Sequence, residues 1–174
     1  MKHRYCLAVV ASAGLMTALG ARSEASTQNS AERCKGPEYR QFDFWIGDWE
    51  VRDNEGKMQG KNLVTSEQSG CVVIEHWDSG AQTGTSLSMY DYRTKDWHQS
   101  WIDNFGNMLM MKGRVENGSM VMAGKRAMPD GKMALERTRW TPLPDGRVRQ
   151  VWDYSLDEGK KWTLRFDGFY SRKK

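Results

Sequence analysis

The chain has little of what most often builds metal, haem or thiol chemistry: three histidines and three cysteines in 174 residues. It contains no C-x-x-C pair, no H-E-x-x-H, no G-x-S-x-G and no P-loop, so no catalytic or metal-binding spacing can be recognised. The mean hydropathy is −0.75, which excludes a polytopic membrane protein. Apart from Arg172-Lys173-Lys174 the chain has no basic block, so we expect no nucleic-acid partner.

The one long apolar stretch lies at the N-terminus. Basic residues at positions 2–4 precede an apolar run over 6–19, and small residues follow at Ser23 and Ala25. This order is typical of a secretory signal peptide, and we predict residues 1–25 to be removed after Ala25. The mature chain then carries 23 basic and 21 acidic residues. We therefore expect a periplasmic or secreted protein with no membrane span after processing; the alternative is an uncleaved anchor.

Two cysteines remain after processing, Cys34 and Cys71. In an oxidising compartment a disulfide between them is the first interpretation. It would close a loop of about 37 residues, worth roughly 3–4 kcal/mol. The alternative, a metal-binding or catalytic thiol, lacks a neighbouring histidine. Residues 26–41 are polar and contain Gly36-Pro37, so we predict an N-terminal leader there and a single domain over 42–174.

Turn signals recur about every eleven residues from Asn54 onwards, and between them lie ten short runs rich in Val, Met, Thr, Trp and Tyr. The signals are Asn54-Glu55-Gly56, Ser69-Gly70, Ser79-Gly80, Arg93–Asp96, Asn104–Gly106, Asn117-Gly118, Pro129–Gly131, Pro144–Gly146 and Asp157–Gly159. Short strands joined by tight hairpin turns predict an all-β protein. Because no long crossover interrupts them, we predict an antiparallel up-and-down β-barrel of about ten strands, which leaves no free edge.

The turn types fix which residues face each other. Treating 117–118 as a two-residue turn pairs Val115 with Met120, and treating 129–131 and 144–146 as three-residue turns continues the same face. The turn at 157–159 adds the pairs Trp152 with Leu164 and Gln150 with Phe166. The predicted interior is Leu109, Met111, Val115, Met120, Met122, Trp140, Trp152, Tyr154, Trp162, Leu164 and Phe166. The predicted outer face is Lys112, Arg114, Lys125, Arg137, Arg149, Asp153 and Arg165.

The turn at Asn104–Gly106 leaves two registers open. A three-residue loop places Trp97, Gln99 and Trp101 inside, whereas a two-residue loop places His98, Ser100 and Ile102 there instead. We predict the first, because it puts the tryptophans in the interior.

A barrel of ten strands is wider than the eight-stranded barrels that side chains nearly fill. Gly113, Gly124 and Gly168 fall on the inner face, and so does Glu136, whose buried carboxylate needs a partner such as its diagonal neighbour Arg126. We therefore predict an aromatic and thioether cavity with a polar cluster; the alternative is a packed core with a satisfied ion pair. The candidate ligand-binding residues are Trp97, Gln99, Trp101, Met111, Met122, Arg126, Glu136, Thr138, Gln150, Trp152 and Tyr154.

Several motifs resemble those of a known family. Gly47-Asp48-Trp49 fits the G-x-W opening of lipocalin-like barrels, in which the tryptophan closes the barrel base. The motifs with it are Phe42–Val51, Gly70–Trp77, Tyr90-Asp91, Trp97–Trp101, Val148–Trp152 and Ser155–Trp162. Together they resemble a family of uncharacterised secreted bacterial proteins with a lipocalin-like, calycin-type β-barrel, over roughly residues 34–171. The resemblance implies a fold and an exported location, and it brings no catalytic residues.

Cofactors are not expected. Nitrobindin-type haem barrels also open with G-x-W, but they ligate haem through a histidine near the C-terminus, and here His76 and His98 lie mid-chain. The cluster Met108, Met110, Met111, Met120 and Met122 has thioethers suited to Cu(I), yet methionine is the usual filler of adaptable apolar cavities.

The function predicted from these patterns is binding of a small apolar or amphipathic molecule inside the barrel, by a protein that is a monomer. A second hypothesis is an enzyme that uses a buried Glu136 as acid or base. A third is a structural or interaction barrel without a pocket. The sequence favours the first and names no catalytic residue.

Overall fold

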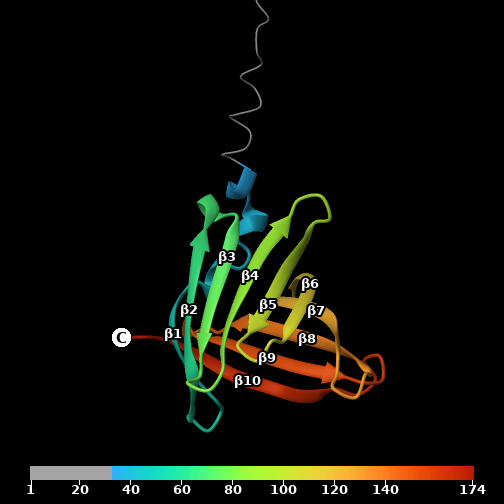
Figure 1. Cartoon of the computed structure of the whole chain (residues 1–174). Helices are drawn as coiled ribbons and strands as arrows, with labels where there is room; N and C mark the ends of the chain where they lie inside the picture. The colour runs from blue at the N-terminus through green and yellow to red at the C-terminus, as the bar shows by residue number, and fades with distance from the viewer. Residues whose placement is uncertain (1–32) are drawn as a thin grey trace, which may run out of the picture.

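The computed structural model describes residues 33–174 and shows a closed antiparallel barrel of ten strands (Figure 1). The predicted signal peptide, residues 1–25, lies outside the described residues. Each strand pairs with the next along the chain, and β1 closes on β10. The strands are β1 (Gly47–Arg52), β2 (Met58–Glu67), β3 (Val72–Asp78), β4 (Thr83–Asp91), β5 (Asp96–Asp103), β6 (Met108–Glu116), β7 (Ser119–Ala127), β8 (Met133–Pro142), β9 (Val148–Ser155) and β10 (Thr163–Arg172). The predicted up-and-down barrel is confirmed.

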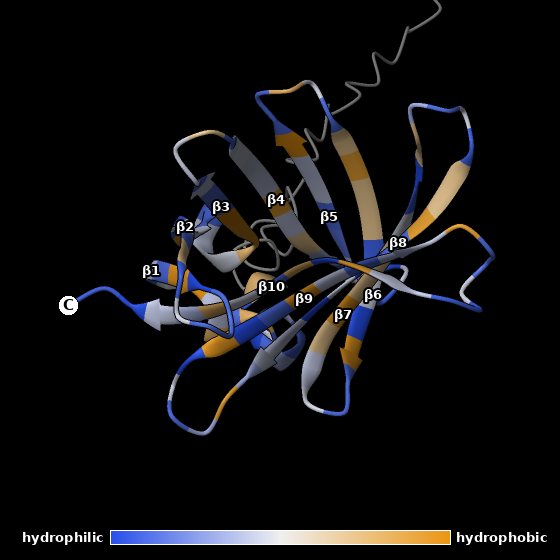
Figure 2. Cartoon of the chain, turned by 90° about the horizontal axis from the view of Figure 1, so that it is seen from below, coloured by the Kyte–Doolittle hydropathy of each residue, from blue (hydrophilic) through white to orange (hydrophobic). Residues whose placement is uncertain are grey.

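The strands are tilted and coil around the barrel interior. In Figure 1 β2 to β5 run upright while β8 to β10 lie across them at the lower end, as the right-handed twist of a sheet requires. Hydrophilic and hydrophobic residues alternate along the strands in the view from below (Figure 2). Within the described residues no helix has the length and apolar character needed to cross a membrane.

The predicted register holds across β5 to β9. Val115 pairs with Met120, Met122 with Thr138, and Trp140 with Gln150. Gln99 pairs with Met111, so the three-residue loop at 104–106 is the correct alternative and the β5 tryptophans are inside. The β6–β7 register follows from local geometry, because Asn117 and Gly118 both have positive φ, as a type I′ two-residue turn requires.

The register predicted for β10 is wrong. Thr163 pairs with Tyr154 and Leu164 with Asp153, so the loop is one residue longer than a three-residue turn allows. Leu164 is therefore on the outer face and 60% exposed. A bulge between Leu164 and Phe166 then restores the inward parity, and Phe166 faces Trp152.

The same shift moves two further side chains. Trp162, predicted inside, lies over the outer ion pair of Arg137 with Asp153, its ring 3.7 Å from the guanidinium carbon. Arg165, predicted outside, sits in the bulge and turns toward the barrel mouth. A one-residue change of register flips every side chain to the other face until a bulge corrects it.

The inner glycines do not enlarge the lumen as predicted. A Cβ on Gly113 would lie 1.9 Å from the Val121 carbonyl oxygen, and one on Gly124 would lie 2.0 Å from that of Met110. At Gly168 it would meet the Phe166 ring at 2.4 Å. The glycines therefore allow neighbouring backbone and rings to approach closely where the sheet bends.

Substituting one of these glycines tests that role. We expect Gly113→Ala to lower the free energy of unfolding by about 1–3 kcal/mol, because backbone must move to admit the methyl group. Gly36→Ala is the matched control, since its Cβ would meet only the flexible Glu38 carboxylate. Urea unfolding measures both; equal stability of the two variants would show that Gly113 faces free space.

One end of the barrel is closed by short 3-10 helices, η1 (Arg33–Lys35), η2 (Pro37–Arg40) and η3 (Asp43–Trp45). Phe42 stacks on Trp45, and both rings contact Trp140, while Trp97 meets Phe42 edge-on. We call these four residues the aromatic plug; all are at most 1% exposed. The predicted leader contacts the barrel through Tyr39, which is buried against Tyr90, and through Gln41, which accepts a hydrogen bond from the Trp97 indole N–H.

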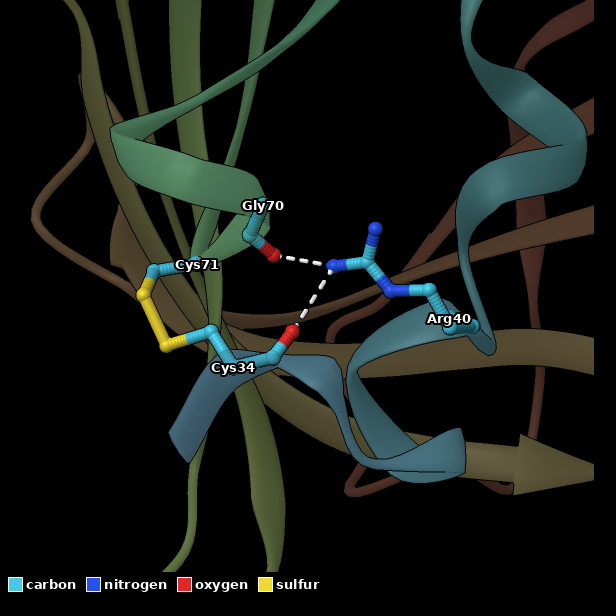
Figure 3. The surroundings of a disulfide bond; sticks show 4 residues. All are labelled: Cys34, Arg40, Gly70 and Cys71. Carbon is cyan, nitrogen blue, oxygen red and sulfur yellow. Dashed lines mark hydrogen bonds between the residues drawn. A yellow bond between two sulfur atoms is a disulfide. The ribbon is translucent and has the colours of Figure 1, made fainter. Parts of the chain in front are cut away.

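The predicted disulfide is present between Cys34 and Cys71 (Figure 3). It ties η1 to the turn η4 (Gln68–Gly70) between β2 and β3. Arg40 donates from Nη2 to the carbonyl oxygens of Cys34 and Gly70, as Figure 3 shows. The bond thereby holds the plug-bearing segment onto the barrel end.

Candidate functional site

A cavity of about 240 Å³ occupies the barrel interior on the other side of the plug. It extends to the end of the barrel where the β3–β4 and β5–β6 turns lie, since Gln82, Asp103 and Asn107 line it. The remaining lining residues are Glu75, Trp77, Gln99, Trp101, Leu109, Met111, Arg126, Thr138, Trp140, Gln150, Trp152, Arg165, Phe166 and Tyr170. The interior is thus open space rather than a fully packed core.

The cavity wall combines aromatic rings with polar side chains. Trp77 on β3 meets Phe166 on β10 edge-on across the lumen, with ring centroids 5.8 Å apart. Trp101 and Trp152 contribute two further rings, and Met111 adds a thioether that accepts a hydrogen bond from Thr138 at 3.6 Å. Such walls bind flat apolar groups through dispersion and ring–ring contacts.

An ion-pair cluster lies beside the mouth. Arg126 donates from Nε and Nη2 to Glu136 Oε1 at 3.0 and 2.7 Å, and the Trp152 indole N–H donates to Oε2 at 2.6 Å. Arg165 completes it at 3.4 Å from Oε1. The predicted pairing of Arg126 with Glu136 is confirmed. The Glu136 carboxylate is fully buried, and two guanidiniums neutralise it.

Arg165 is a site residue that the sequence did not reveal. Its guanidinium lies 5.4 Å from the Trp152 ring and 4.7 Å from the Tyr154 ring. Its side chain keeps 30% of its surface exposed, whereas that of Arg126 keeps 17%. Arg165 therefore offers unused N–H donors at the cavity mouth.

A second carboxyl group, Glu75, faces the inner part of the cavity. Asn62 donates from Nδ2 to Oε1 at 2.8 Å, and the Ser86 hydroxyl donates to Oε2 at 2.6 Å. Gln99 in turn donates to Ser86 and to Ser88. Burial raises the pKa of Glu75 to about 7, although both hydrogen bonds act to lower it.

Tyr170 on β10 completes the inner polar region. Its hydroxyl donates to Gln150 Oε1. Burial raises the pKa of Tyr170 well above the usual value, and the nearby charge of Glu75 adds to the rise. The phenol therefore stays neutral in the physiological range. The Trp140 indole N–H is buried with no partner among residues 33–174.

The structure divides the sequence-predicted site residues into two groups. Those that line the cavity are Gln99, Trp101, Met111, Arg126, Thr138, Gln150 and Trp152. Those that do not are Trp97, Met122, Glu136 and Tyr154. Trp97 belongs to the plug and Met122 to the packed core. Glu136 is covered by its own partners, and Tyr154 lies beside Arg165.

Comparison with known proteins gave no match, either to a family model or to a curated protein sequence. The cavity, with Glu75 in its wall and the Glu136 ion pair beside it, is the feature that indicates a function.

Proposed function

We propose that this protein is an exported, lipocalin-like barrel that binds one small amphipathic molecule in its cavity. The observation that supports it most is the cavity itself, about 240 Å³ of open space behind an aromatic plug. Pockets for small molecules in proteins span roughly 300–1,000 Å³, so the ligand belongs at or below the small end of that range.

The chemistry of the walls supports an amphipathic ligand. Four rings and a thioether surround the middle of the cavity, while Glu75, Gln150 and Tyr170 offer polar groups at its inner part. Polar groups that converge on a pocket beside apolar rings orient a ligand and select it. The Cys34–Cys71 disulfide is compatible with an oxidising location outside the cytoplasm.

The two other sequence-based hypotheses receive less support. A barrel without a pocket is disfavoured by the open space. An enzyme that uses Glu136 is disfavoured because both carboxylate oxygens are occupied by Arg126 and Trp152 and the group does not line the cavity.

A pair of variants on one strand tests the proposal. Met111 lines the cavity, whereas its neighbour Met110 points outward and is 55% exposed. With 2-phenylethanol as the probe, isothermal titration calorimetry should give one site per chain in the wild type. Met111→Trp should weaken binding at least tenfold by filling the lumen, while Met110→Trp should leave it unchanged.

The control variant adds the same indole on the opposite face, and the far-UV circular dichroism spectrum of each variant shows whether it keeps the fold. No heat of binding in the wild type, or equal loss of affinity in the two variants, would contradict a binding site inside the barrel.

A further inference from the structure

We propose that the inner part of the cavity binds a protonated amine, which pairs with Glu75, so that the ligand is a small aromatic amine. The inference rests on the proposed binding function and names the chemical class of its ligand. It follows from a difference between the two buried carboxyl groups of the barrel interior.

Glu75 is surrounded by donors suited to a carboxylate. Both of its oxygens accept hydrogen bonds, one from an amide and one from a hydroxyl, at 2.8 and 2.6 Å. Gln99 donates a hydrogen bond from Nε2 to the Ser86 hydroxyl oxygen at 3.3 Å, which fixes the orientation of the Ser86 hydroxyl group. Neutral dipoles arranged in this way stabilise a negative charge.

What Glu75 lacks is a cation. No lysine, arginine or histidine of the described chain forms an ion pair with it, although its residue is only 5% exposed. Glu136 is equally buried but has two guanidiniums at 2.7 and 3.4 Å. Without a cation Glu75 keeps its proton up to about pH 7. Once ionised it needs a partner of opposite sign, which the cavity side of this carboxyl group can receive from outside.

The surroundings also suit an ammonium group. Trp77, Trp140 and Tyr170 line the cavity together with Glu75, and the faces of such rings attract cations. Asn62 Oδ1 is buried and accepts no hydrogen bond within residues 33–174. The apolar part of the ligand would then extend toward Trp101, Trp152 and Phe166 nearer the mouth.

The pH dependence of binding follows from the groups that face Glu75. They are Asn62 on β2, Ser86 on β4, Gln99 on β5 and Tyr170 across the lumen on β10; the charged Arg126, Glu136 and Arg165 belong to the mouth cluster. Of the facing groups only Tyr170 titrates, and it stays neutral. An amine must bind the ionised carboxyl group, whose pKa is about 7 in the free protein. Affinity should therefore rise about tenfold from pH 6 to pH 8.

A series of probes of one shape tests the inference. The probes are 2-phenylethylamine, 2-phenylethanol, propylbenzene and 3-phenylpropanoate, which differ in charge and polarity at one end. Calorimetric titration at pH 8 should give the amine at least tenfold higher affinity than the alcohol. Glu75→Gln should abolish the preference for the amine but still bind the alcohol. Binding of the alcohol then shows that the variant is folded. Glu116→Gln, at an exposed carboxylate on β6, is the matched control and should change nothing.

The outcomes separate the two proposals. A preference for the amine that depends on Glu75 and increases with pH supports the inference. Equal affinities across the series, a preference for the alcohol or the anion, or an amine affinity that falls as pH rises would overturn it and leave the binding function standing. If no probe binds the wild type, both proposals fail.

Discussion

Removing the disulfide, by Cys34→Ser together with Cys71→Ser, should lower the free energy of unfolding by about 3–4 kcal/mol. The bond joins positions 37 apart in the sequence, and opening that loop releases conformational entropy in the unfolded chain. Removing the disulfide should also make the aromatic plug more mobile, because this bond and Arg40 hold η1 to η4. Urea unfolding followed by tryptophan fluorescence measures the change.

The wild type in reductant is the internal control for the serine variant. Reduced wild type and serine variant should unfold at the same urea concentration, below that of the oxidised protein. A difference below 1 kcal/mol between oxidised and reduced protein would contradict a structural role for the bond.

The second large effect is the change in the free energy of unfolding with pH that Glu75 causes. Its pKa rises from 4.5 in the unfolded chain to about 7 in the barrel. Between these values the folded protein keeps a proton that the unfolded chain has lost, so stability falls as pH rises through this window. The total cost of ionising the group in the fold is about 3 kcal/mol, at 1.36 kcal/mol per pKa unit. Above pH 7 the protein has lost all of the stability that the Glu75 proton contributes.

Glu75→Gln should remove this slope. A glutamine accepts from Asn62 with its oxygen and donates to Ser86 with its nitrogen, so both neighbours keep a partner. The variant should match the wild type near pH 4.5 and exceed its free energy of unfolding above pH 7. Denaturant titrations at pH 5, 6, 7 and 8 measure the difference, and parallel curves for the two proteins would contradict a buried, proton-holding Glu75.

The part of the barrel that could be predicted from sequence is the part with unambiguous turns. Asn117-Gly118 permits one tight hairpin geometry, and the Pro-Asp-Gly turns continue the same pairing. Side-chain alternation then determined the inner face of β6 to β9, including Arg126 beside Glu136. Local stereochemistry was sufficient there because each turn fixes the next register. For β5 the turn left two registers open, and the inner face was chosen by its tryptophans.

The β9–β10 connection could not be predicted for a physical reason. Ser155 Oγ accepts the Gly159 N–H, and Asp157 Oδ1 accepts the Lys161 N–H, which holds a longer loop than its Asp-Glu-Gly sequence suggests. The bulge at Arg165 has no sequence signature. Because neither the longer loop nor the bulge could be predicted, the sequence did not reveal that Arg165 on β10 reaches the cavity mouth.

Glu75 escaped prediction because its strand lacks clear alternation. Val72, Val73 and Ile74 are all apolar, so the pattern does not say which face of β3 is inside. The partners of Glu75 come from β2 and β4, whose registers the sequence left undetermined. Glu75 pairs directly with Ser86 and lies diagonally to Asn62 within β2–β4, and closure of the barrel adds Tyr170 on β10.

The most direct test of the account is an NMR titration of the tryptophan indole N–H signals, of which the chain has eight. Adding 2-phenylethanol should shift the signals of Trp101 and Trp152, which line the cavity, and leave those of Trp49 in the core and Trp162 on the outer face unchanged. Single Trp→Phe variants assign the signals. Unmoved Trp101 and Trp152 signals at saturating probe, or shifts confined to Trp162, would contradict a binding cavity within the barrel.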